Sequence, residues 1–312
     1  MSQKRIALLF SGQGAQTVGM GLDLAEAFPE AATLYRRADA QLGYALSRVS
    51  WEGPEAALTE TRHCQPALYV HGLACLEALR SLAGAFAFHA AAGLSLGEFT
   101  AHAAAGTFDF ETGLRLVSER GTFMQEACEA TAGGMAAMIG GDESAVVQLA
   151  ADCGVDVANF NCPGQLVLSG EKEGIAQAVA LAKERGIRMA KPLNVAGAYH
   201  SRLMRPAALK LSGVLAGVEF AQPRAMVYCN VDAAPVSEAT EIRTTLERQV
   251  TGSVRWTQTL ERLLDEEQCD LFLELGPGGV LAGLLGRTRK GAQCVSVCDA
   301  ASVAAAAELL RA

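Results

Sequence analysis

Runs of consecutive hydrophobic residues alternate with longer amphipathic stretches along most of the chain. The runs Ile6–Phe10, 87–93 and Leu271–Leu275 are short and mostly apolar, as expected of strands buried on both faces of a sheet. Hydrophobic positions with helical spacing occur between them, at 66–82, 98–105, 205–215, 240–249 and 256–264. Apolar strands separated by helices predict an α/β fold, with a parallel sheet covered by helices on both faces.

The middle of the chain has a different pattern. Its elements are expected in the order β-α-β-β-α-β, at 135–139, 142–153, 155–160, 165–168, 171–185 and 188–195. This order is typical of a ferredoxin-like subdomain. The same elements could instead extend the main sheet, but the hairpin turn at 161–164 fits a parallel sheet poorly. We therefore predict a small ferredoxin-like subdomain at 134–196, inserted into a large α/β-hydrolase-like domain formed by 1–133 and 197–312.

Composition and charge exclude several classes of protein. The 312 residues are 50% hydrophobic and carry a formal net charge of −8 with no block of Lys and Arg, which argues against a nucleic-acid partner. No stretch reaches the roughly 18 apolar residues of a membrane span, and the first apolar run is too short for a signal peptide. The nine cysteines are scattered without a CxxC pair, so we expect reduced thiols, no metal site and a cytoplasmic protein.

The sequence Gly93-Leu94-Ser95-Leu96-Gly97 places a GxSxG motif between a predicted strand and a predicted helix. Glycines on either side of a serine allow the sharp turn that projects a nucleophilic hydroxyl from the end of a strand. The alternative is a glycine-rich turn whose serine caps the helix. The strand-turn-helix context favours Ser95 as a nucleophile.

A nucleophilic serine needs a base, and the chain has five histidines. His71 and His102 lie inside apolar helices and are expected to be packed there, while His63 and His89 have no companion motif. His200 follows the small subdomain, where a loop re-enters the large domain. It is the candidate general base, with a pH-rate limb expected near neutrality.

Seven segments, in order along the chain, are similar to the malonyl-CoA:acyl-carrier-protein transacylases of fatty-acid synthesis. The resemblance covers residues 5 to 310, and its segments are 10–16, 93–98, 120–125, 159–165, 197–200, 230–232 and 274–279. It implies that Ser95 is the nucleophile and that His200 is its base, oriented by a backbone carbonyl at Gln249. It also implies an oxyanion hole made of the backbone N–H groups of Gln13 and Leu96.

The resemblance further implies a substrate pocket with a charged clamp. Arg120, which we place at a helix end, matches the arginine that holds the malonyl carboxylate. Gln65 and Asn161, together with Gln13, match residues that line the pocket. Tyr199 before the base is large, which favours malonyl over methylmalonyl.

One position departs from the family pattern. Leu94 stands where the family usually has a histidine before the nucleophile, so a polar group next to the Ser95 turn is lost. The serine, both glycines and Glu98 remain. The departure bears on acyl specificity and rate rather than on the nucleophile itself.

The sequence thus predicts an enzyme that transfers a malonyl group from malonyl-CoA to the phosphopantetheine thiol of an acyl carrier protein. No separate cofactor is expected, since the coenzyme A thioester is a substrate, and we expect a monomer. Two alternatives share this chemistry, a polyketide-synthase acyltransferase acting in trans and the transacylase component of a malonate decarboxylase. A serine esterase or thioesterase is the alternative from another class, although its histidine would lie nearer the C-terminus.

Overall fold

The computed structural model describes residues 4–311 and contains two sheets. The larger sheet has six strands in the order β10-β9-β1-β2-β7-β8. Its strands are β1 (Ile6–Phe10), β2 (Ala90–Gly93), β7 (Met226–Tyr228), β8 (Pro235–Val236), β9 (Leu271–Leu275) and β10 (Cys294–Val297). All neighbours pair in parallel except β7 and β8, which are antiparallel.

Successive side chains of β1 enter two different hydrophobic layers. Leu8 and Phe10 join the cluster formed with α5 (Thr61–Ala83), α6 (Leu96–Ala104) and α14 (Ala300–Arg311). Ala7 and Leu9 join the opposite cluster, formed with α12 (Trp256–Asp265) and α13 (Val280–Thr288). Because both faces of the sheet are covered, the strand is apolar throughout, as the hydrophobic pattern predicts.

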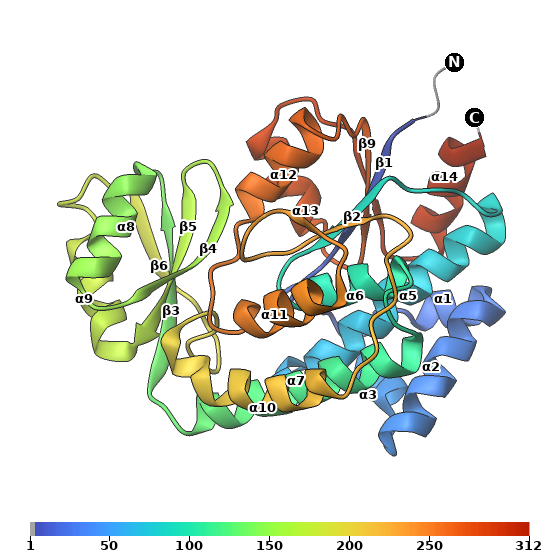
Figure 1. Cartoon of the computed structure of the whole chain (residues 1–312), viewed down its shortest axis with the longest axis horizontal. Helices are drawn as coiled ribbons and strands as arrows, with labels where there is room; N and C mark the ends of the chain where they lie inside the picture. Colours follow the sequence, from blue (N-terminus) through green and yellow to red (C-terminus); the bar gives the residue numbers. More distant parts are fainter. Residues whose placement is uncertain (1–3, 312) are drawn as a thin grey trace.

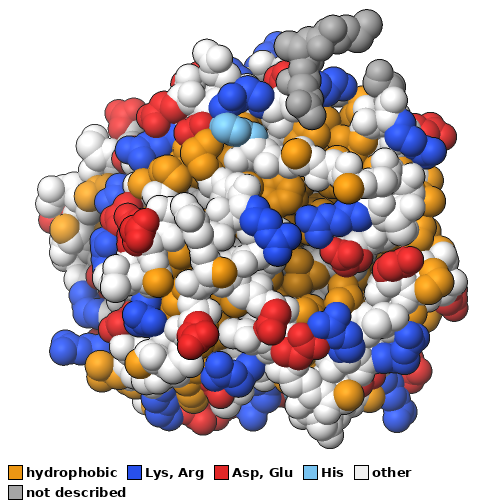
Figure 2. Space-filling model, turned by 45° about the vertical axis from the view of Figure 1, so that its right-hand side comes forward, with side chains coloured by type: hydrophobic (Ala, Val, Ile, Leu, Met, Phe, Trp, Pro, Cys, Tyr) orange, Lys and Arg blue, Asp and Glu red, His pale blue; other side chains and the backbone are white. Residues whose placement is uncertain are grey.

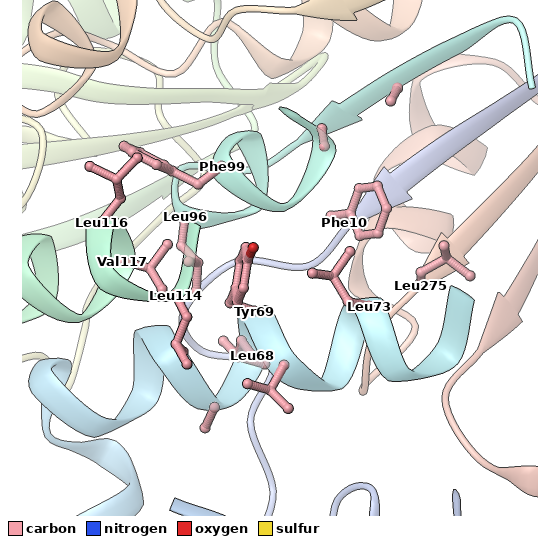
Figure 3. Close-up of a cluster of buried hydrophobic side chains, with 14 of the residues drawn as sticks. Phe10, Leu68, Tyr69, Leu73, Leu96, Phe99, Leu114, Leu116, Val117 and Leu275 are labelled. Atoms are coloured by element: carbon pink, nitrogen blue, oxygen red, sulfur yellow. The ribbon is translucent and has the colours of Figure 1, made fainter. Parts of the chain in front are cut away.

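Figure 3 shows how α7 (Phe110–Glu129) packs against α5 and α6 through apolar contacts. Leu114, Leu116 and Val117 of α7 lie near side chains of α5 and α6, all in one buried cluster. This packing fixes the position of Arg120 farther along the same helix. The remaining helical segments are α1 (Leu22–Ala27), α2 (Pro29–Leu42), α3 (Leu46–Glu52), α4 (Glu55–Thr59), the 3-10 turn Arg202–Met204, α10 (Arg205–Ala216) and α11 (Ala239–Gln249).

The smaller sheet lies beside the larger unit, at the left of Figure 1. Its strand order is β4-β5-β3-β6, and every neighbouring pair is antiparallel. The strands are β3 (Gly133–Ile139), β4 (Asp156–Cys162), β5 (Gln165–Glu171) and β6 (Met189–Pro192), and the helices are α8 (Glu143–Asp152) and α9 (Lys172–Leu181). The two helices pack on one face of this sheet. The predicted α/β fold with a separate ferredoxin-like sheet is confirmed, while the division at 134–196 stays a prediction.

Two local predictions are wrong. The helix predicted over 66–82 begins at Thr61, so Pro66 lies inside α5 and not in its first turn. Burial of residues on both sides of Pro66, such as Gln65 and Ala67, holds the helix although one N–H is missing. Arg120 is not at a helix end either, because α7 runs without a break from Phe110 to Glu129.

Figure 2 shows one face of the molecule with basic and acidic side chains interspersed and hydrophobic side chains visible in hollows between them. A cavity of about 1070 Å³ is lined by α2, α5, α7 and the segment 217–224, and it contains none of the predicted site residues. Among residues 4–311, no helix is both long and apolar enough to cross a membrane.

Candidate active site

Ser95 occupies a sharp turn between β2 and α6. Its φ of 55° and ψ of −106° lie outside the regions that non-glycine residues usually adopt, a strain typical of functional turns. A Cβ atom on Gly93 would lie 2.0 Å from the carbonyl carbon of Gly97, and one on Gly97 would lie 2.2 Å from the carbonyl oxygen of Phe10. Both flanking glycines are therefore required by close backbone contacts, and the turn projects the Ser95 hydroxyl into a pocket.

The Ser95 hydroxyl contacts His200, which comes from a distant loop. Its Oγ lies 2.7 Å from His200 Nε2, and His200 Nδ1 lies 2.9 Å from the carbonyl oxygen of Gln249 and 3.1 Å from that of Gly252. Carbonyl oxygens only accept hydrogen bonds, so Nδ1 carries the proton and Nε2 presents its lone pair to Ser95. The geometry suits proton abstraction from the serine.

Burial changes the expected titration of His200. Burial and the nearby Arg120 guanidinium lower the pKa of His200 to about 4, although the two carbonyl contacts oppose this shift. The imidazole is therefore neutral at physiological pH. We therefore expect the pH-rate limb of His200 at an acidic pH, and not near neutrality as the sequence predicted.

Arg120 reaches the same serine from α7 and is buried, with 1% of its surface exposed. Its Nη2 donates to Ser95 Oγ at 3.0 Å and to Gln249 Oε1 at 2.8 Å, and its Nη1 donates to Gln65 Oε1 at 2.7 Å. The guanidinium also lies over the Phe99 ring, 5.4 Å from its centroid. A buried, permanently charged fork beside the nucleophile is suited to binding a carboxylate.

Three polar side chains, those of Asn230, Glu98 and Gln249, connect these groups. Asn230 Oδ1 accepts from the Ser95 N–H at 2.7 Å, and Asn230 Nδ2 donates to the Gly93 carbonyl at 2.8 Å. Glu98 Oε2 accepts from the Asn230 N–H at 2.9 Å and from Gln249 Nε2 at 2.7 Å. Glu98 and Asn230 stood in segments that match the family, which was the available signal, but their contacts join elements far apart in sequence.

A cavity of about 320 Å³ collects the predicted site residues. Its lining includes Gln13, Gln65, Ser95, Leu96, Arg120, Asn161 and His200. Gln249 is not part of the lining but accepts a hydrogen bond from Arg120. Asn161 Oδ1 is buried and has no hydrogen-bond partner among the described residues. The structure thus brings every predicted site residue to one place.

Two further residues of interest line the cavity. Leu94 is half-buried and contributes an apolar wall where the family usually has histidine. Tyr199 is 7% exposed, and its Oη lies 2.6 Å from Thr61 Oγ1, which holds the ring in place at the cavity wall. Both side chains therefore border the cavity that contains Ser95.

The backbone N–H groups of Gln13 and Leu96 have no hydrogen-bond acceptor within residues 4–311. Leu96 is the first residue of α6, where N–H groups are left free by the helix geometry. Two free N–H groups beside a nucleophile can stabilise an oxyanion.

The described residues contain no group of three or more His, Cys, Asp or Glu side chains that could hold a metal ion. All nine cysteines are free thiols, and seven of them are buried.

Comparison with known proteins matches residues 7–305 to the model of the acyl transferase domain family. The malonyl CoA-acyl carrier protein transacylase of Haemophilus influenzae is 40% identical over 98% of this chain and 99% of its own length. The solved transacylase of the same name from Coxiella burnetii has a TM-score of 0.95 at 32% identity and covers 99% of both chains. A malonyl-transacylase solved in complex with a type II polyketide-synthase acyl-carrier protein has a TM-score of 0.94 at 39% identity, over 98% of this chain and 99% of that one. The chain belongs to the acyl transferase family, among the malonyl-CoA:acyl-carrier-protein transacylases.

Proposed function

We propose that this enzyme transfers a malonyl group from malonyl-CoA to the phosphopantetheine thiol of an acyl carrier protein, through a malonyl ester on Ser95. The observation that carries the proposal is the position of one hydroxyl between two groups. Ser95 Oγ lies 2.7 Å from a neutral imidazole nitrogen of His200 and 3.0 Å from a guanidinium nitrogen of Arg120. The first group can take the serine proton, and the second can bind the free carboxylate of the acyl group.

In the first half-reaction, Ser95 Oγ attacks the thioester carbonyl while its proton passes to His200 Nε2. The N–H groups of Gln13 and Leu96 stabilise the oxyanion of the tetrahedral intermediate. When the C–S bond breaks, His200 returns the proton to the departing coenzyme A thiolate, leaving malonyl-Ser95 and free thiol.

In the second half-reaction, the carrier's thiol gives its proton to His200 and attacks the ester. The C–O bond breaks, and the proton returns to Ser95 Oγ. Throughout both steps the carbonyl of Gln249 holds the imidazole in one tautomer, and Arg120 holds the malonyl carboxylate. No metal or prosthetic group takes part, because the coenzyme A thioester is a substrate and the phosphopantetheine belongs to the partner.

The mouth of the cavity supports a long thioester arm as substrate. Val280 and Val195, which are 45% and 36% exposed, line it together with the exposed Arg287. Exposed aliphatic side chains suit the pantetheine arm, and a cation at the rim suits phosphate.

The pathway has two candidates with the same chemistry. Fatty-acid synthesis is the first candidate, and polyketide synthesis is the second. The second is supported by a transacylase, 39% identical to this chain, that was solved with a type II polyketide-synthase carrier bound. Competition between the two kinds of carrier for malonyl-loaded enzyme distinguishes them.

The test of the mechanism is acylation in the absence of a carrier. Incubation with malonyl-CoA alone should add one malonyl group to the peptide that contains Ser95, and a carrier added later should remove it to its thiol. Ser95→Ala is the matched control and should carry no adduct. An adduct at the wild-type level in Ser95→Ala, or release to water faster than to the carrier, would contradict the proposal in favour of another nucleophile or of a thioesterase.

A further inference from the structure

Glu98 is a buried acid in the active site for which the proposed mechanism has no use. Its side chain is 0% exposed. Oε2 accepts from the Asn230 N–H at 2.9 Å and from Gln249 Nε2 at 2.7 Å, whereas Oε1 has no partner among the described residues. A carboxylate in such a place is costly unless a cation compensates it.

Arg120 is the buried cation that lacks an acid. No carboxylate of the described residues lies within ion-pair distance of its guanidinium, and its Nε has no partner there. Its connection to Glu98 runs through one amide. Gln249 Nε2 donates to Glu98, and Gln249 Oε1 accepts from Arg120 Nη2 at 2.8 Å. An ionised Glu98 can only accept, so it directs the amide nitrogen to itself and the amide oxygen to Arg120.

The charges balance only while the pocket is empty. Arg120 and Glu98 then form a neutral, amide-bridged pair. A malonyl group on Ser95 adds a second carboxylate, and Arg120 cannot compensate two buried anions. The least costly remedy is a proton on Glu98, whose free Oε1 can carry it.

Resting on the proposed function, we propose that Glu98 is a specificity-determining residue. In the free enzyme Glu98 is the counter-charge of Arg120. When the carboxylate of an acyl group takes over that role, Glu98 takes up a proton. Binding of malonyl is thereby coupled to proton uptake, whereas binding of acetyl is not. Selection for malonyl then depends on two groups, the arginine that receives the carboxylate and the glutamate that gives up its charge.

The surroundings of Glu98 support this behaviour. Burial raises the pKa of Glu98 to about 7, against the opposing contributions of Gln249, Asn230 and Arg120. The other titratable groups that face it are Cys229, whose pKa is raised to about 11, and Asp232, which is bound to Arg248. His200 lies across Arg120 and is neutral near pH 7. Removing the partner charge of Arg120 raises the pKa of Glu98 further, so Glu98 is the group that gains the proton.

The coupling has a definite sign. A ligand that raises a pKa binds more tightly to the protonated form, so the preference for malonyl should decrease as pH rises. We therefore expect the malonyl-to-acetyl ratio of kcat/KM to fall about five- to tenfold between pH 6.5 and 8.5. Titrations of His200 and of the coenzyme A phosphates act on both substrates and cancel in this ratio.

The experiment compares wild type with Glu98→Gln, which is close in size and cannot titrate. In Glu98→Gln the ratio should be independent of pH. Wild type should also take up more protons per malonyl ester near pH 8 than Glu98→Gln, measured with an indicator dye, since both release the same thiol. Glu274→Gln is the matched control, because Glu274 is also 0% exposed but binds the N–H groups of Leu281 and Ala282 outside the cavity. It should keep the wild-type slope.

A malonyl-to-acetyl ratio in wild type that does not change with pH overturns the inference. This result does not depend on whether any variant folds. A slope that persists in Glu98→Gln overturns it as well and assigns the titration to another group. Arg120→Ala separates the two proposals. Suppose that Arg120→Ala lowers the malonyl-to-acetyl ratio at every pH, and that the pH dependence of this ratio persists in Glu98→Gln. The transacylase mechanism then stands, and the proposed role of Glu98 fails. If Arg120→Ala leaves the ratio unchanged, the proposed role of Arg120 fails.

Discussion

At the scale of single residues, the chemistry depends on the two groups that contact the Ser95 hydroxyl. His200 and Arg120 both contact Ser95 Oγ, at 2.7 and 3.0 Å, and each is oriented by a different part of Gln249. The carbonyl of Gln249 fixes the imidazole, and its amide oxygen fixes the guanidinium. One residue thus aligns the proposed base and the proposed carboxylate clamp.

Arg120→Ala should reduce the malonyl-to-acetyl preference by well over tenfold. Losing a buried charge-assisted pair costs on the order of 2–5 kcal/mol with malonyl, while acetyl has no carboxylate to leave unpaired. The measurement is kcat/KM for both thioesters. Arg115→Ala is the control, because Arg115 lies on the same helix with 44% of its side chain exposed, and it should leave the preference unchanged. An equal loss for both thioesters in Arg120→Ala would indicate a structural role.

Leu94→His should keep activity within about tenfold, because the proton transfer and the oxyanion donors are untouched. Both forms should show one acidic limb in kcat/KM against pH, at a pKa near 4 set by the buried His200. Activity should fall below this pH, where the base is protonated. A wild-type enzyme that is nearly inert with malonyl-CoA, yet rescued a hundredfold by histidine, would overturn the assignment.

At the scale of elements, the site is built where three segments converge. The turn from β2 to α6 presents Ser95, α7 presents Arg120, and the C-terminal end of α11 presents Gln249. Apolar packing of α7 against α5 and α6 fixes the distance between clamp and nucleophile (Figure 3). A change in that packing should therefore affect selection of the acyl group before it affects the nucleophile.

Carrier binding belongs to this scale because it depends on exposed basic residues grouped on elements. An acidic carrier protein should encounter this enzyme faster through a local basic patch, because the net charge of −8 would otherwise repel it. One candidate cluster, Arg287, Arg289 and Lys290, lies at the end of α13, and Arg287 borders the cavity. The other candidate cluster consists of Lys183, Arg185, Arg188 and Lys191, which lie between the end of α9 and the end of β6 of the small subdomain.

Reversing the charges of Arg287 and Lys290 should raise the carrier's KM by about tenfold at low salt, and the effect should shrink as salt is added. Arg289 is left unchanged, because it binds Asp265 at 2.9 Å. The measurement uses enzyme preloaded with malonyl, so coenzyme A does not enter. Reversal of Lys183 and Arg188 is the parallel arm. If neither pair changes the KM, the carrier docks elsewhere.

At the scale of the whole molecule, the cavity forms where the two sheets meet. β4 of the small sheet is bound to the large unit by the Phe160 N–H, which donates to the Val254 carbonyl at 2.9 Å, and by the Val254 N–H, which donates to the Ala158 carbonyl at 2.8 Å. The wall with Asn161 therefore comes from the small sheet, and Ser95 comes from the turn that follows β2 of the large sheet. The large unit also buries three histidines, His71, His102 and His200.

Acid should destabilise the protein between pH 6.5 and 4.5. Burial lowers the pKa values of His71, His102 and His200 to about 4, 3 and 4 from the usual 6.5, so the unfolded chain binds three more protons in this range. Glu98, with its pKa raised from 4.5 to about 7, contributes one proton in the opposite direction. The net difference of about two protons predicts a loss of roughly 2–3 kcal/mol of unfolding free energy per pH unit.

Denaturant titrations at pH 6.5, 5.5 and 4.5 measure this slope. His71→Gln should reduce it by about one proton. Stability that is constant across this range would show that these histidines are accessible to protons in the folded state.

The sequence by itself determined the elements, the two kinds of sheet, the family and the identity of the expected nucleophile and base. Those conclusions depend on local pattern and on ordered motifs, such as the apolar run Ile6–Phe10 and the glycines around Ser95, which act within a few residues. Only the tertiary structure decided the roles suggested for Glu98 and Asn230, the burial of Arg120 and the acidic shift of the His200 pKa. Burial, hydrogen bonds between distant segments and electrostatic coupling arise when those segments pack together, so no local pattern contains them.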